Sequence, residues 1–253
     1  MGVLVAGGVL AGLLGGLLAG AFGVGGGIVL VPMLSLVLGL DQHQAQGITL
    51  TVLLAPVSLP AVLAYQRRFP IRWRLAATLA LGFLPGVAAG SRIAVALPDR
   101  PLRVLFALFM LVVAWRTWRS GAEGHAGERP AGSAWHGLWI GLLGGLLAGT
   151  FGVGGAIAMI PFLTGVVGLS QHRAQATTLA AMLPPIGLPG VMIYAGSAGG
   201  LPWLLLAAVT AGYLAGAFAG AEVAARTGSR RLSRAFALFV LVSSLALFAR
   251  ALR

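Results

Sequence analysis

Two short glycine-rich runs are the residues of this sequence best suited to bind a ligand. Phe22 to Gly27 reads F-G-V-G-G-G, and Phe151 to Ala156 reads F-G-V-G-G-A. Each run interrupts a long apolar segment, so we expect a new helix to begin after it with backbone N–H groups that have no intrahelical acceptor. The helix dipole places partial positive charge at such an end, and the absent Cβ atoms let a tetrahedral oxyanion approach the main chain. The runs therefore predict anion binding.

The predicted anion-binding residues are Gly23, Val24, Gly25, Gly26 and Gly27 in the first run and Gly152, Val153, Gly154, Gly155 and Ala156 in the second. The alternative is that these glycines only allow tight helix packing, as we expect of the GLLGG and LLAG runs before them. The duplication of the run at a helix break favours the binding interpretation. Ala156 replaces the final glycine of the first run, so the two sites need not be equivalent.

A polar cluster follows each glycine run, at the start of the next helix. Its members are Gln46, Thr49 and His43 in the first copy and Gln175, Thr178 and His172 in the second. The threonine and glutamine side chains could complete a shell around an oxyanion. The two histidines are either part of that site, with a role in coupling, or capping and interface residues of the helix start.

Two charged residues lie well inside apolar segments, at equivalent positions of the two copies. They are Arg92 and Glu222. Either they pair across a pseudo-two-fold axis, or each lies close enough to a helix end to extend its charge to the membrane surface. Glu222 is the only carboxylate that the sequence places for intramembrane proton coupling.

Motifs for catalysis and for cofactor binding are absent from the sequence. It has no Ser/His/Asp set, no HExxH, no paired acids, no Walker loop and no dinucleotide fingerprint attached to a strand. Without Cys it can form no disulfide, thiolate nucleophile or Cys-ligated metal site. We expect no enzyme activity, no metal and no cofactor.

The composition is that of a membrane protein. Of the 253 residues, 58% are hydrophobic and 9% charged, whereas a soluble domain carries about a quarter charged residues. The net charge of +12 comes from arginines dispersed among short loops, which predicts orientation in a membrane and not nucleic-acid binding. The expected partners are a small anion and the lipid bilayer, and the expected location is the cell membrane, crossed several times.

The chain is an internal duplication. Residues 12–65 match 141–194 without a gap, with more than half of the positions identical, and 72–90 match 202–220. The sequence therefore predicts one repeat at 1–119, a linker at 120–134 and a second repeat at 135–253.

Each repeat contains four apolar segments. The first segments span 3–38 and 135–168, and we predict helices at 44–65, 73–97 and 101–119 in the first repeat and at 172–194, 201–226 and 229–251 in the second. A helix of about 36 residues would extend roughly 54 Å against a bilayer core of about 30 Å, so the first segment must break, and we place the break at the glycines. The prolines Pro56, Pro60, Pro185 and Pro189 mark either a second discontinuity or a packing kink.

The distribution of the arginines distinguishes between two membrane topologies. If each first segment crosses the membrane once, they divide about evenly between the two sides, which the positive-inside rule disfavours. If the segment folds back, one side keeps only Arg92, Arg100, Arg103, Arg250 and Arg253. We therefore predict an all-α polytopic membrane protein with two inverted repeats, each a Gly-broken helical hairpin plus three transmembrane helices, and with both termini outside.

These features resemble the TauE/SafE family of sulfite exporter-like transporters. The resemblance covers essentially the whole chain and rests on the duplicated GxFGVGGGxxxVPxL element, the A-x-x-T-L start of the next helix, and the segment GSRIAVALPDRPLRVLFALFMLV. It implies transport of a small sulfur-containing or carboxylate anion such as sulfite, sulfoacetate, sulfolactate or thiosulfate.

The resulting hypothesis is a secondary transporter, expected to be an exporter, of a small oxyanion such as sulfite or an organosulfonate. The anion would bind near the midplane between the two helix breaks. An anion channel and a non-transporting membrane subunit or assembly factor remain as alternatives.

Overall fold

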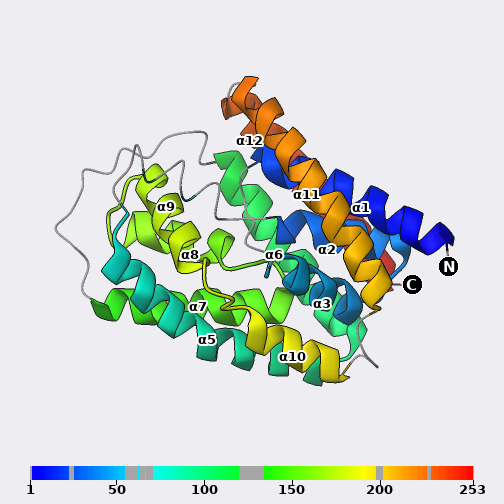
Figure 1. Ribbon diagram of the computed structural model, residues 1–253, viewed down its shortest axis with the longest axis horizontal. Helices are drawn as coiled ribbons and strands as arrows, with labels where there is room; N and C mark the ends of the chain where they lie inside the picture. The colour runs from blue at the N-terminus through cyan, green and yellow to red at the C-terminus, as the bar shows by residue number, and fades with distance from the viewer. Residues whose placement is uncertain are drawn as a thin grey trace.

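The computed structural model describes residues 2–22, 26–54, 62, 66, 71–119, 134–197, 202–226 and 229–252, and these contain helices and no strand (Figure 1). The helices of the first half are α1 (Gly2–Phe22), α2 (Gly27–Leu38), α3 (Gln42–Val52), α5 (Trp73–Ala96) and α6 (Asp99–Arg119). Those of the second half are α7 (Ala134–Phe151), α8 (Ala156–Gly165), α9 (Gln171–Ala181), α10 (Leu188–Ser197), α11 (Trp203–Arg226) and α12 (Ser229–Leu252). The predicted linker lies outside the described residues, apart from Ala134.

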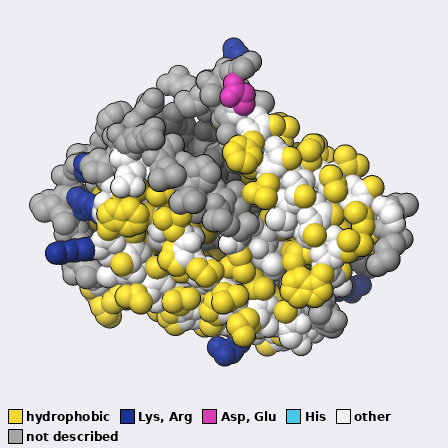
Figure 2. All heavy atoms as spheres, in the orientation of Figure 1, with side chains coloured by type: hydrophobic (Ala, Val, Ile, Leu, Met, Phe, Trp, Pro, Cys, Tyr) yellow, Lys and Arg dark blue, Asp and Glu magenta, His cyan; other side chains and the backbone are white. Residues whose placement is uncertain are grey.

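The described helices are those of a membrane protein. Helices α1, α5, α6, α11 and α12 are each long and apolar enough to cross a bilayer. Figure 2 shows apolar side chains spread over the visible face, with the coloured charged side chains at its margins. Exposed tryptophans lie near helix ends, as is typical of membrane–water interfaces; they are Trp73, Trp115, Trp118, Trp135 and Trp203. The prediction of an all-α polytopic membrane protein is confirmed.

Both long first segments break at their glycine runs. Helix α1 ends at Phe22 and α2 begins at Gly27, while α7 ends at Phe151 and α8 begins at Ala156. Helix α2 then runs back along α1, because a Cβ atom on Gly7 would lie 2.8 Å from the side chain of Leu38 and one on Gly15 would lie 2.8 Å from that of Leu30. As numbers rise along α1 they fall along α2, so the pair is antiparallel.

The two repeats pack against each other through glycine faces. Helix α1 lies along α11, and α7 lies along α5, so equivalent helices of the duplicated sequence form equivalent pairs. The glycines at these contacts recur at every fourth position; they are Gly12, Gly16 and Gly20 on α1, Gly212, Gly216 and Gly220 on α11, Gly82, Gly86 and Gly90 on α5, and Gly141, Gly145 and Gly149 on α7. A Cβ atom on any of them would lie 2.0–2.3 Å from a carbonyl oxygen of the facing helix. The packing role expected of the GLLGG and LLAG runs is confirmed.

The predicted helix 172–194 is wrong. The chain forms α9 and α10 instead, and residues 182–187 between them are not helical. Pro184 and Pro185 have no N–H group to donate, and the bend is held by bonds from Ile186 N to Pro184 O (2.6 Å) and from Leu188 N to Pro185 O (3.0 Å). The prolines of the second half therefore mark a second discontinuity, whereas Pro56 and Pro60 lie outside the described residues.

One end of the molecule carries both termini and the end of α2 (Figure 1). Arg250 of α12 donates to the carbonyl oxygens of Ser35 and, at 3.4 Å, Gly39. Gly39 closes α2 in the left-handed conformation at φ 71°. A cation at a helix C-terminus satisfies free carbonyls and opposes the helix dipole, so Arg250 fastens α2 to α12.

Candidate functional site

The start of α2 meets the second glycine run. A Cβ atom on Gly27 would lie 2.4 Å from the carbonyl oxygen of Val153, so the two backbones are in direct contact. A Cβ atom on Gly152 would lie 2.8 Å from Cα of Gln46, which brings α3 to the same place. Elements from both halves of the chain therefore converge on residues 152–155. The other residues of the first run, Gly23, Val24 and Gly25, lie outside the described residues.

Both helices that begin at the glycine runs lack a side-chain cap. The cap residue of α2 is Gly26, at φ 78°, and that of α8 is Gly155. The first helical bonds run from Leu30 N to Gly26 O and from Met159 N to Gly155 O, both at 2.9 Å. Val29 N and Ala158 N donate to the same two carbonyl oxygens, each at 3.1 Å. The N–H groups of the first two residues of each helix, Gly27 and Ile28 in α2 and Ala156 and Ile157 in α8, have no acceptor in a preceding helical turn. They belong to buried main chain, where an unsatisfied donor is costly, so the two helix starts are suited to hold an anion.

Helix α3 presents polar side chains to this convergence. Gln46 and Thr49 are fully buried, and Gln46 Nε2 and Thr49 Oγ1 have no hydrogen-bond partner among the described residues. Asp41 caps the helix by accepting a hydrogen bond from Gln44 N at 2.7 Å. The cap fixes where α3 starts and therefore where Gln46 and Thr49 lie along the helix axis. Gln46 Nε2 is therefore held beside the second glycine run, at Gly152, without an acceptor in the described part of the chain, and Thr49 lies about one turn further along α3.

Tyr194 of α10 orients Gln46. Its hydroxyl lies 2.7 Å from Gln46 Oε1 and 2.8 Å from the carbonyl oxygen of Gly149. A hydroxyl has one proton, so it donates to one of the two, and a turned Gln46 amide would donate to it instead. An anion beside Gln46 favours the orientation with Nε2 free to donate to it. Tyr194 was not among the predicted site residues, although Tyr ends both copies of the gap-free repeat.

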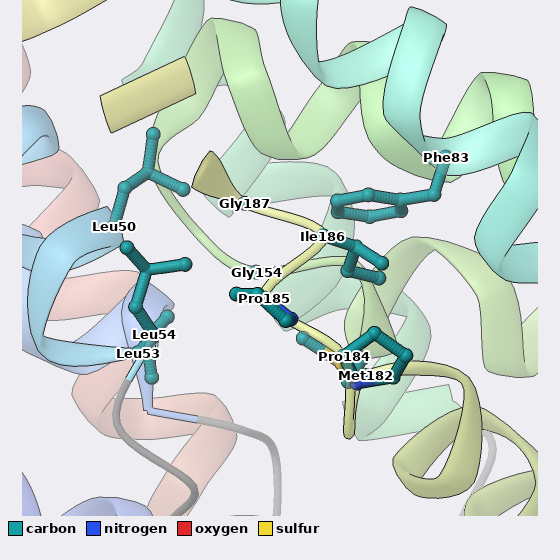
Figure 3. Close-up of a pocket in the computed structure, with 10 residues that line it drawn as sticks. All are labelled: Leu50, Leu53, Leu54, Phe83, Gly154, Met182, Pro184, Pro185, Ile186 and Gly187. Atoms are coloured by element: carbon teal, nitrogen blue, oxygen red, sulfur yellow. The ribbon is translucent and has the colours of Figure 1, made fainter. Parts of the chain in front are cut away.

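A small, mostly apolar pocket lies against the second glycine run. It is lined by Leu50, Leu53, Leu54, Phe83, Gly154, Met182, Pro184, Pro185, Ile186 and Gly187. Figure 3 shows the three leucines on one side, Phe83, Ile186 and Pro184 on the other, and Gly154 between them. Gly154 is buried and has φ 71°, a conformation that favours glycine. The glycine run thus contacts the polar side chain of Gln46 at Gly152 and lines the apolar pocket at Gly154.

The equivalent polar residues of the second half lie on α9. Thr178 is fully buried and its Oγ1 has no partner among the described residues. Gln175 is half-buried and His172 is exposed, and both make interactions within the protein. Helix α9 packs against α5 and α8. The structure therefore places Gln46 at the glycine run 152–155, and it places Gln175 and Thr178 on a separate helix.

His43 lies at the outer end of α3 and not at the convergence. Its Nε2 is 3.0 Å from the carbonyl oxygen of Ala94, and its Nδ1 is 3.7 Å from Asp99 Oδ1. Asp99 also accepts from Gln42 N at 2.5 Å and pairs with Arg103. The cluster favours the interface interpretation of His43, because it fastens the start of α3 to α5 and α6.

Asp41, His43 and Asp99 also place three potential metal ligands within 4.8 Å of one another. The carboxylates are already engaged, Asp41 with Gln44 N and Asp99 with Gln42 N and Arg103. These contacts explain the cluster as an attachment of α3.

Replacing Asp99 by Asn is expected to destabilise the protein by about 1–2 kcal/mol, because Arg103 loses its charged partner and the start of α3 loses a charged acceptor. Thermal unfolding of the purified variant measures this. His172→Gln, which changes the repeat equivalent of His43 on an exposed position, serves as the control. An unchanged melting temperature for Asp99→Asn would contradict the attachment.

Arg92 and Glu222 are both exposed, on α5 and α11. Their exposure favours the interpretation that each side chain extends its charge to the membrane surface. Glu222 makes interactions within the protein.

The family model described as Sulfite exporter TauE/SafE matches residues 8–247. The matched region includes both glycine runs, α3 and α10. No curated protein and no solved structure matches the chain significantly.

Proposed function

The chain belongs to the sulfite exporter TauE/SafE family of membrane transporters, and from this premise we propose that it is a secondary transporter that exports a small oxyanion, such as sulfite or an organosulfonate, across the cell membrane. The observation that carries the proposal is the contact between Gly27 and Val153, which joins two uncapped helix starts from the two repeats. Converging backbone donors at helix starts favour an oxyanion over a cation or a neutral solute.

The proposed site lies at half depth in the membrane. Helices α2 and α3 have 12 and 11 residues, and α8 and α10 have 10 each. At about 1.5 Å per residue each covers roughly half of a bilayer core of about 30 Å. Helices that begin or end near the midplane and line a substrate site are typical of transporters with inverted repeats.

The two repeats are proposed to be inverted relative to each other. The exchange of partners supports this, because α1 packs on α11 of the second repeat and α7 packs on α5 of the first. The position of Arg103 and Arg250 beside the start of α3 and the end of α2 agrees with a shared, arginine-poor outer side. In this arrangement the proposed ligand-binding groups are the two glycine runs, with Gln46 and Thr49 of one repeat and Gln175 and Thr178 of the other.

The proposal is tested by thermal unfolding of detergent-purified protein with sulfite, sulfate, thiosulfate, sulfoacetate, sulfolactate, taurine and acetate. A ligand at 100 times its dissociation constant stabilises the folded state by about 2.7 kcal/mol. We expect a sulfur oxyanion to raise the melting temperature and acetate to leave it unchanged. If no anion raises it, the protein is better explained as a non-transporting membrane subunit. If an anion does raise the melting temperature, its flux is measured in proteoliposomes. Flux that saturates at transporter rates would indicate a transporter and not a channel.

Replacing Gln46 by Met is expected to weaken anion binding about tenfold, because a side chain of similar length loses its donor while Tyr194 still donates to Gly149. The melting temperature without anion should change little. Anion titrations of the melting temperature measure both quantities. Gln44→Met, on the same helix and half-buried, is the control, and equal affinity in the Gln46 and Gln44 variants would exclude Gln46 from the site.

A further inference from the structure

One face of α3 carries a buried polar stripe. Gln42, Gln46 and Thr49 stand at i, i+4 and i+7, which places them on one side of a helix. All three are 0% exposed, and each has at least one polar side-chain atom without a hydrogen-bond partner among the described residues. Gln42 is the extreme case, since both its Oε1 and its Nε2 lack a partner.

Such a stripe is costly if it is permanently dry. Unpaired polar groups inside a membrane protein are tolerated where they line a water-filled cavity or a substrate path. The adjacent face of α3 shows the contrast, because Ile48 and Val52 are equally buried and belong to the apolar core. The polar atoms therefore mark one side of the helix for contact with water or a ligand.

The stripe connects the surface of the protein to the proposed site. Its outer end is beside Asp41, which is exposed, and beside Asp99, which binds Gln42 N and Arg103. Its inner end is Gln46 against Gly152, followed by Thr49 one turn deeper. The rise from residue 41 to 49 is about 12 Å, close to the distance from the edge of a bilayer core to its midplane.

We propose that the Gln42–Gln46–Thr49 face of α3 is the wall of the outer half of the substrate path, and that Gln42 is its outermost residue. The proposal rests on the proposed transport function and adds a route to it. The structure shows this route closed, since the three side chains are fully buried. Transport requires that α3 separate from the helices facing the stripe, so access to the stripe is the property that changes during the cycle.

Substituted-cysteine accessibility tests the route directly, because the chain contains no Cys and every introduced thiol is the only one. Gln42→Cys, Gln46→Cys and Thr49→Cys are treated in proteoliposomes with the membrane-impermeant 2-sulfonatoethyl methanethiosulfonate, which itself carries a sulfonate. Ile48→Cys and Val52→Cys are the matched controls, with the same burial on the same helix. Thr49→Cys is nearly isosteric, so it is expected to fold even if Gln42→Cys does not.

We expect the three stripe positions to react at least about tenfold faster than the controls, because only a water-exposed thiolate reacts. Sulfate should slow the reaction at Thr49→Cys, which keeps Gln46, by occupying the site. Unreactive stripe positions, or equal rates at stripe and control positions, would overturn the route. Labelling reports water access whatever anion is carried, so a failed labelling pattern and a failed thermal-shift screen remain separate results.

Discussion

Anion-dependent stabilisation is expected to disappear when Gly154 is replaced by Val. Gly154 has φ 71°, lines the apolar pocket, and lies two residues after Gly152, which contacts Gln46. A β-branched side chain is strained in this conformation and fills the space next to the first N–H groups of α8. We expect the affinity for a sulfur oxyanion to fall at least about 100-fold, because the backbone donors and the close approach are lost together.

The control for this variant is Gly168→Val. Gly168 has φ 74° and follows α8 at its far end, so the substitution introduces the same backbone strain away from the proposed site. Both variants should lose about 1–2 kcal/mol of stability without ligand. Titration of the melting temperature with the stabilising anion distinguishes them. Equal affinity in the two variants would remove the second glycine run from the site.

The glycine runs and the repeat were readable from the sequence because each is a local pattern. A run such as F-G-V-G-G-A interrupts helix preference wherever it lies, so the ends of α1 and α7 follow from it. The regular spacing of Gly141, Gly145 and Gly149 likewise indicates a close helix contact. The sequence could not identify the facing helix, because that depends on how the two repeats associate.

Dependence on contacts between distant parts of the chain also explains which features could not be predicted from the sequence. The bend at 182–187 lies in an apolar stretch that is as hydrophobic as a transmembrane span. Two adjacent prolines, Pro184 and Pro185, can either kink a helix or end it, and which of the two occurs depends on the surrounding structure. The roles of Tyr194 and Asp99 depend on contacts distant in sequence, with Gln46 and with Gln42. Hydropathy alone left open whether Arg92 and Glu222 pair inside the membrane or extend to its surface, and the structure places both on exposed faces of their helices.

Close packing at the glycine faces positions the site, so the largest loss of stability is expected from Gly145→Val. A Cβ atom at this position would lie 2.3 Å from the carbonyl oxygen of Phe83. Helices α5 and α7 would have to separate along their length, which we expect to cost more than about 3 kcal/mol because membrane helices associate mainly through such packing. Gly196→Val is the control, since a Cβ atom there meets nothing within 4 Å, and it should change stability by less than about 0.5 kcal/mol.

Gly16→Val makes the equivalent change in the first repeat, where a Cβ atom would lie 2.1 Å from the carbonyl oxygen of Tyr213. Because the contacts are equivalent, the two variants should lose similar stability, measured by thermal or denaturant unfolding in detergent. Both should also lose anion binding, since α7 leads into the second glycine run and α11 places Tyr213 against Gly26. If one variant were destabilised and the other unchanged, the α1–α11 and α5–α7 contacts would not stabilise the site equally. The description of the protein as a pseudo-symmetric transporter would then be wrong.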